Sequence, residues 1–134
     1  MKITYSIFAI FIFFIAGSCI GTYGSPAIVS MLDQKHLKEF DDYILCKAYG
    51  FSQSENVRRE LENRKIFTIL DWEVIDKKQV KIGMSVCALY ASWGVPDNEN
   101  RSVSRYGTTI QHVYGRDYPV YVYSEDGFVT GWQD

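Results

Sequence analysis

The sequence predicts an α+β domain in which two or three helices precede a three- to four-stranded antiparallel meander and pack on it. Between residues 33 and 93 the apolar side chains recur at spacings of three and four, which is typical of one face of a helix. After Asn100 the spacing changes to two, the period of a half-buried strand. Because the two patterns are segregated along the chain, we expect the helices to cover one face of a sheet formed by residues 101–133.

The first eighteen residues have the order of a secretory signal peptide. Met1-Lys2 supplies a positive charge, residues 7–16 are an apolar run, and Gly17-Ser18 end the run with small side chains. The next residue, Cys19, indicates a lipoprotein signal, in which the thiol is lipidated and the chain is cut before it. We therefore expect residues 1–18 to be removed and Cys19 to be the lipid-attachment site, with acyl chains such as palmitate as the membrane anchor.

Two other interpretations of this segment stay open: a transmembrane anchor and an ordinary signal cut after Ser18. An anchor needs about 20 apolar residues to cross the bilayer, more than the apolar run provides. An ordinary cleavage site requires small side chains, which Ala16 and Ser18 supply. Ala16 also departs from the bacterial lipobox, which more often has leucine three residues before the cysteine. Ile20, in place of an aspartate after the cysteine, favours the outer membrane over the inner one, with the domain facing the periplasm.

The charge balance excludes a nucleic-acid partner. The chain has 14 Lys and Arg against 16 Asp and Glu, and removing residues 1–18 takes away one lysine and no acid. The remaining bases are interspersed with acids, so the sequence predicts no basic patch. The ten tyrosines suit half-buried strands and binding surfaces equally well, because the ring combines contact area with a polar tip.

A flexible tether is expected before a single folded domain of residues 33–134. The tether, residues 19–32, contains Gly21, Gly24, Ser25 and Pro26. The first helix of the domain is expected to begin at Asp33 and to end at Gly50. Its apolar face is formed by Leu37, Phe40, Ile44 and Ala48.

Further helical segments are expected after Gly50. Residues 52–55 fit a capping box that opens a second helix running through Asn63, and most of that helix faces water. Residues 71–75 predict a helical turn with Trp72 and Ile75 pointing inward. The last helix begins after the cap Ser85, ends at Gly94 and Pro96, and carries one apolar face of Val86, Leu89, Tyr90 and Trp93.

The cysteines that remain after lipidation of Cys19 are an even pair, Cys46 and Cys87. In an exported protein such a pair predicts a disulfide. The alternative is two buried free thiols that act as small apolar side chains. Both residues lie near apolar helical faces, so the sequence leaves the choice open.

The strands are expected at residues 101–106, 109–114, 120–123 and 128–132. Gly107 turns the first hairpin. The last hairpin turns at Glu125-Asp126-Gly127, because Asp-Gly accepts the positive φ that tight turns require.

Residues 80–133 resemble the SmpA/OmlA family, small lipoproteins related to the BamE subunit of the outer-membrane β-barrel assembly machine. The motifs that carry the resemblance are residues 82–85 (IGMS), 93–96 (WGVP), 111–115 (QHVYG), 120–123 (VYVY) and 126–130 (DGFVT). It implies a BamE-like helix-and-sheet fold, a lipid anchor and an envelope setting. The implied fold is also similar to that of β-lactamase inhibitor proteins, which bind enzymes.

The sequence shows no catalytic or metal-binding constellation. His36 and His112 are isolated, and we expect both to be plain surface or edge residues, because a metal site needs several ligands at set spacings. Asp41-Asp42 is expected to be solvated. Cys46 and Cys87 lack the activating base of a nucleophile. No cofactor, no metal and no enzymatic activity are therefore predicted.

The function that the sequence predicts is that of a non-catalytic envelope lipoprotein that binds another protein. The candidate binding surface is an exposed sheet face with Tyr114, Tyr121, Tyr123 and Trp132, because aromatic side chains dominate binding hot spots. The alternative for these rings is that they fill the core under the helices. A secreted or anchored enzyme inhibitor is the second functional hypothesis, and an envelope hydrolase is the third.

Overall fold

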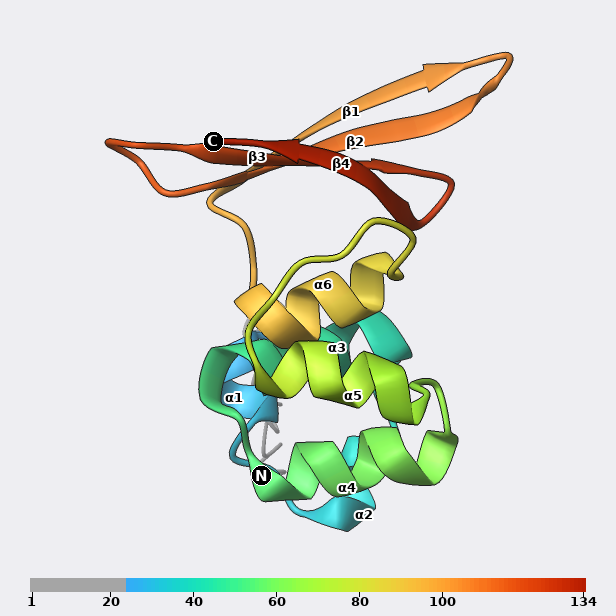
Figure 1. Cartoon of the computed structure of the whole chain (residues 1–134). Coiled ribbons are helices and arrows are strands. Elements are labelled where there is room, and N and C mark those ends of the chain that lie inside the picture. Colours follow the sequence, from blue (N-terminus) through green and yellow to red (C-terminus); the bar gives the residue numbers. More distant parts are fainter. Residues whose placement is uncertain (1–23) are drawn as a thin grey trace, which may run out of the picture.

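The computed structural model describes residues 24–134, which form six helices followed by a four-stranded antiparallel sheet. The predicted α+β class is therefore confirmed, and all the labelled helices lie on one side of the sheet (Figure 1). The predicted signal segment and Cys19 lie outside the described residues. The helices are α1 (Pro26–Val29), α2 (Gln34–Leu37), α3 (Asp42–Ser52), α4 (Glu55–Arg64), α5 (Ile69–Asp76) and α6 (Val86–Trp93).

The tether prediction is wrong for residues 24–32, because they pack on the domain. Ser25 caps α1 by accepting a hydrogen bond from the backbone N–H of Ile28 at 3.4 Å, and Pro26 occupies the first turn, where its missing N–H costs nothing. Val29 is fully buried in the core that α1 shares with α3. Serine and proline therefore start a short helix here, and the buried Val29 packs it on the domain.

The single helix predicted for residues 33–49 is two helices with a break between them. Asp33 caps α2 as expected and accepts from the N–H groups of Lys35 and His36, both at 3.1 Å. Asp41 caps α3 by accepting from Ile44 N–H at 2.9 Å.

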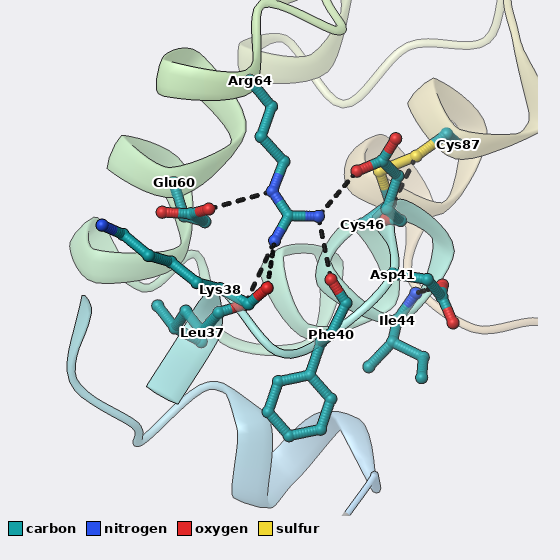
Figure 2. Close-up of polar contacts among 10 residues, drawn as sticks. Leu37, Lys38, Phe40, Asp41, Ile44, Cys46, Glu60, Arg64 and Cys87 are labelled. Carbon is teal, nitrogen blue, oxygen red and sulfur yellow. Dashed lines mark hydrogen bonds and ion pairs between the residues drawn. A yellow bond between two sulfur atoms is a disulfide. The ribbon is translucent and has the colours of Figure 1, made fainter. Parts of the chain in front are cut away.

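The break is stabilised by Arg64 of α4 (Figure 2). Its guanidinium donates to the carbonyl oxygens of Leu37 (3.2 Å), Lys38 (3.3 Å) and Phe40 (2.8 Å). The Leu37 carbonyl also accepts from the Phe40 N–H at 3.3 Å, so a local turn and a side chain distant in sequence together hold the break.

Two predictions about helix starts need correction. Ser54, the residue before α4, makes no side-chain capping bond, so the predicted capping box at residues 52–55 does not form. A capping box does form at the start of α5, between Thr68 and Asp71. The expected helical turn at residues 71–75 is therefore part of a longer helix, which buries Ile75 completely.

Helices α3 and α6 form the centre of the helical layer. Ser85 caps α6 by accepting from Ala88 N–H at 3.1 Å, and Gly94 ends the helix with a φ of +85°, as predicted. Gly50 does not end α3, which continues to Ser52. Instead Gly50 lies against Gly94 where α3 and α6 contact each other. The core of the domain contains fully buried aliphatic side chains from the helices and the sheet: Leu37, Leu45, Val57, Leu61, Ile75, Leu89, Val122 and Val129.

The sheet is a meander of strands β1 (Asn98–Ser104), β2 (Gly107–Tyr114), β3 (Val120–Glu125) and β4 (Phe128–Gln133). All four predicted strands are present, but the first is shifted: β1 spans Asn98–Ser104 in place of residues 101–106. The hairpin turns at residues 105–106, and Gly107, which was expected to form the turn, begins β2. Asp126 and Gly127 both have positive φ in the last turn, as the Asp-Gly prediction requires. Within residues 24–134 no helix is long and apolar enough to cross a membrane.

Candidate protein-binding surface

The strand register divides the predicted binding residues between the two sides of the sheet. Val122 of β3 is fully buried, so its side faces the helices. Trp132 is paired with Val122 and lies on that same side, as does Tyr114, which reaches the end of α6. Tyr121 and Tyr123 flank Val122 in the strand and therefore lie on the opposite, outer face. The expected single surface of four rings is thus wrong.

Tyr114 and Trp132 fill space between the sheet and α6. The Tyr114 hydroxyl donates to the carbonyl oxygen of Gly94 at 3.1 Å, and its ring lies edge-on to Trp93 with the centroids 5.3 Å apart. Burial raises the pKa of the Tyr114 hydroxyl. Trp132 is about half exposed and lines a shallow hollow with Trp93 and Val80. The core alternative therefore describes Tyr114, whereas Trp132 is an exposed ring on the helix-facing side of the sheet.

The outer face carries a chain of side-chain hydrogen bonds that crosses all four strands. The amide of Asn100 donates to Gln111 at 2.8 Å, and Gln111 donates to the Tyr123 hydroxyl at 3.1 Å. Tyr123 in turn donates to the side-chain oxygen of Gln133 at 3.4 Å. The register adds a Val113–Tyr121 pair beside this chain. We define the outer face by Asn100, Gln111, Val113, Tyr121, Tyr123 and Gln133.

No helix of the described chain covers the outer face, because all the labelled helices lie on the other side of the sheet (Figure 1). Each hydrogen bond across the strands fixes a rotamer, so the face is ordered before any partner binds. Two half-buried tyrosine rings, three amide side chains and one valine combine apolar contact area with hydrogen-bonding groups. Such a mixture is typical of surfaces that bind proteins.

His112 is fully buried, which corrects its prediction as a surface or edge residue. Its ring lies between Glu99 of β1 and Ser124 of β3, at 3.0 Å from the Glu99 Oε1 atom and 2.9 Å from the Ser124 Oγ atom. The edge of the ring also contacts Tyr90 of α6, with the centroids 5.7 Å apart. The Tyr90 hydroxyl donates to the same Glu99 oxygen, so this cluster ties β1, β2 and β3 to α6.

The order serine, histidine, glutamate resembles a nucleophilic triad, but the burial of the serine prevents that chemistry. A nucleophile must reach a substrate carbonyl. Ser124 is 1% exposed and His112 is completely enclosed. Burial tends to raise the pKa of Glu99, but hydrogen bonds from Tyr90 and His112 outweigh it and leave that pKa below its usual value. The cluster therefore holds the sheet in place over α6.

We expect the protein to lose stability as the pH falls below about 6.5, the ordinary pKa of a histidine. Burial lowers the pKa of His112 in the folded protein, against an opposing effect of Glu99. The unfolded chain then binds a proton that the folded protein does not take up. The burial of neutral His112 costs no stability at a pH above the pKa that the residue has in the unfolded chain. Stability is lost as the pH falls from that value towards the lower pKa of His112 in the folded protein. Melting temperatures measured between pH 7.5 and pH 5 test it.

The matched variants for this measurement are His112→Gln and His36→Gln. His36 lies exposed in α2, as predicted, with its ring 2.7 Å from the Asp33 carboxylate, so His36→Gln serves as the comparison in which a surface imidazole is removed. His112→Gln should flatten that dependence. An unchanged slope in His112→Gln would show that another group causes the loss.

The remaining candidate residues have structural contacts. Cys46 and Cys87 form a disulfide that joins α3 to α6, with their Cα atoms 5.4 Å apart, which settles the choice that the sequence left open. Of the expected solvated pair, Asp41 caps α3, and Asp42 forms an ion pair with Arg64 at 2.8 Å. Within residues 24–134 no group of three or more His, Cys, Asp or Glu side chains could hold a metal ion.

Comparison with known proteins adds no family assignment. No family model matches the chain, and neither a curated protein nor a solved structure matches it. The resemblance of residues 80–133 to the SmpA/OmlA family therefore stays a prediction that rests on the quoted motifs.

Proposed function

We propose that this protein is a non-catalytic lipoprotein of the cell envelope whose α+β domain binds another protein through the outer face of its sheet. The observation that carries the proposal is the uncovered outer face, with its chain of hydrogen bonds from Asn100 to Gln133. Anchoring through Cys19 would hold the domain at the outer membrane. Outer-membrane assembly or envelope maintenance is the proposed setting, in line with the SmpA/OmlA resemblance.

Hydrogen bonds across the strands restrain the side chains of the outer face in the free protein. A partner that covers it meets side chains whose rotamers are already fixed, so less conformational entropy is lost on association. Tyr121 and Tyr123 supply rigid rings with few rotatable bonds, which is the property that favours tyrosine in binding sites. The burial of Ser124 supports the non-catalytic part of the proposal, since it leaves the one triad-like cluster of the described residues without access to substrate.

A photo-crosslinking amino acid at position 121 tests the proposal in intact cells. We expect illumination to join the protein to one partner, which mass spectrometry then identifies. In a binding assay with that partner, Tyr123→Ala should weaken affinity by about 30-fold, the effect of a hot spot worth about 2 kcal/mol. The melting temperature should change little, because the Tyr123 side chain lies on the uncovered face.

The matched control carries the same crosslinker at Arg59, an exposed residue of α4 on the opposite side of the molecule from the sheet. It should give no product with the same partner. Equal products from both positions, or unfolding of Tyr123→Ala, would contradict the proposed role of the outer face.

Replacing Cys19 by serine tests the anchor separately. We expect Cys19→Ser to move the protein from the membrane fraction to the soluble fraction after cell lysis, because the thiol that carries the lipid is lost. Protein that stays in the membrane fraction after this change would rule out lipid attachment at Cys19.

A further inference from the structure

The two edges of the sheet differ in how they are covered. The backbone of β4 is bonded beyond the sheet: Gly83 N–H donates to the carbonyl oxygen of Val129 at 2.7 Å, and Val129 N–H donates to that of Met84 at 2.8 Å. β1 is exposed along all seven residues and has no backbone hydrogen bond in residues 24–134 except to β2. It contains no proline, lysine or register shift, the usual devices that protect an edge strand.

A groove lies beneath this edge, on the helix-facing side of the sheet. The hairpin of β1 and β2 extends past the helices, as Figure 1 shows. The groove has a volume of about 570 Å³. Its residues, which we call the hairpin groove, are Tyr43, Val86 and Tyr90 from the helices and Arg101, Thr108 and Ile110 from the hairpin, with Asp126 and Gly127 at the next turn.

The hairpin is positively charged, although the whole chain has a formal net charge of −2. The hairpin, residues 98–114, contains two arginines, Arg101 and Arg105, against one acid, Glu99. Arg101 lines the groove, and no carboxylate of the described residues lies within ion-pair distance of it. Arg101 is exposed and therefore accessible to a partner, and a carboxylate can accept two parallel hydrogen bonds from its guanidinium.

The register shows which side chains of β1 an added strand would meet. Glu99, Arg101 and Val103 pair with His112, Ile110 and Thr108, so they share the helix-facing side. Val103 is 70% exposed. A strand paired with β1 would place alternate side chains next to these three positions. An acid next to Arg101 and an apolar residue next to Val103 would be favoured, whereas an acid next to Glu99 would be repelled.

We propose that the open edge of β1 and the hairpin groove bind an extended segment of a partner protein, in which an acidic residue and an apolar residue stand two positions apart. The segment adds a fifth strand by backbone hydrogen bonding, and the two side chains fix its register. This binding mode goes beyond the outer face, because it uses the backbone of β1 and its helix-facing side chains, whereas the outer face binds through side chains on the other side of the sheet. Either site can therefore fail in a test without the other.

A second copy of the chain fits this site less well than an acidic partner segment does. The only acid in β1 is Glu99, and its carboxylate already accepts hydrogen bonds from Tyr90 and His112. Pairing of two β1 edges would therefore offer Arg101 no free carboxylate. Dimer formation is nevertheless a distinct outcome that the experiment below detects.

Selection from a random library of displayed peptides, each about twelve residues long, tests the inference on the full-length protein in detergent. We expect enrichment of peptides that carry Asp or Glu two positions from Val, Ile or an aromatic residue. Arg101→Glu should weaken binding of a selected peptide by about tenfold or more, because a like charge then faces the acid. Arg59→Glu makes the same charge change on α4 and should leave the affinity unchanged.

Backbone pairing is tested with N-methylated versions of a selected peptide. Methylation of alternate amides that face β1 should abolish binding, and methylation of the others should not. The inference is overturned if the library yields no binders, if the binders lack acids, if Arg101→Glu binds them equally well, or if sedimentation shows a dimer that Arg101→Glu disrupts. Circular dichroism of each variant confirms that the fold is intact, and the crosslinks from position 121 report on the outer face independently.

Discussion

Gly50→Ala is expected to destabilise the protein by about 2 kcal/mol or more, measured by urea unfolding. A Cβ atom at this position would lie 1.9 Å from the carbonyl oxygen of Tyr90 and 2.7 Å from the Cα atom of Gly94. Both are backbone atoms of the α6 end, so no side-chain rotation relieves the overlap. The helix propensity of alanine gains about 1 kcal/mol over glycine, which is too little to offset the separation of α3 from α6.

Gly131→Ala is the matched control, because a Cβ atom there meets nothing within 4 Å. Its effect should stay within about 0.5 kcal/mol, because the added methyl group would overlap with no other atom. A Gly50→Ala protein as stable as the parent would show that the α3–α6 contact yields more easily than the geometry indicates.

Gly50 also shows where the sequence stops predicting the fold. Features encoded within a few neighbouring residues were predicted correctly: the Ser85 cap, the Gly94 stop and the Asp126-Gly127 turn. Gly50 was interpreted by the same local logic as a helix end, but the structure uses its missing side chain for contact with a helix far along the chain. The break between α2 and α3 has the same origin, since it depends on Arg64 of α4.

The sequence predicts part of the candidate surface, because the alternation of side chains along a strand is also a local pattern. The period of two correctly separates neighbouring side chains in β3, so Tyr121 and Tyr123 share one face and Val122 takes the other. The period does not say which face the helices cover. It does place His112 on the same side as Ile110 and Tyr114, a signal that could have indicated burial. Its partners come from two other strands and α6, so the cluster itself was not visible.

Removal of the Cys46–Cys87 disulfide is expected to have the largest effect, a loss of about 4 kcal/mol. The bond joins residues separated by 41 positions, so it strongly restricts the unfolded chain. A typical domain has only about 5–15 kcal/mol of stability, so this loss brings the protein near unfolding at physiological temperature. The measurement compares urea unfolding of the parent with that of a Cys46→Ala, Cys87→Ala double variant.

Reductant provides the internal control for the disulfide, because it should destabilise the parent and leave the double variant unchanged. Alkylation of both cysteines in the folded, unreduced protein would contradict the bond outright. The disulfide and Gly50 act on the same pair of helices, so their effects should not add. Without the bond, α3 can move away from α6 and relieve the overlap at position 50. Gly50→Ala should therefore cost less in the double variant than in the parent, and equal costs would mean that the two contacts are independent.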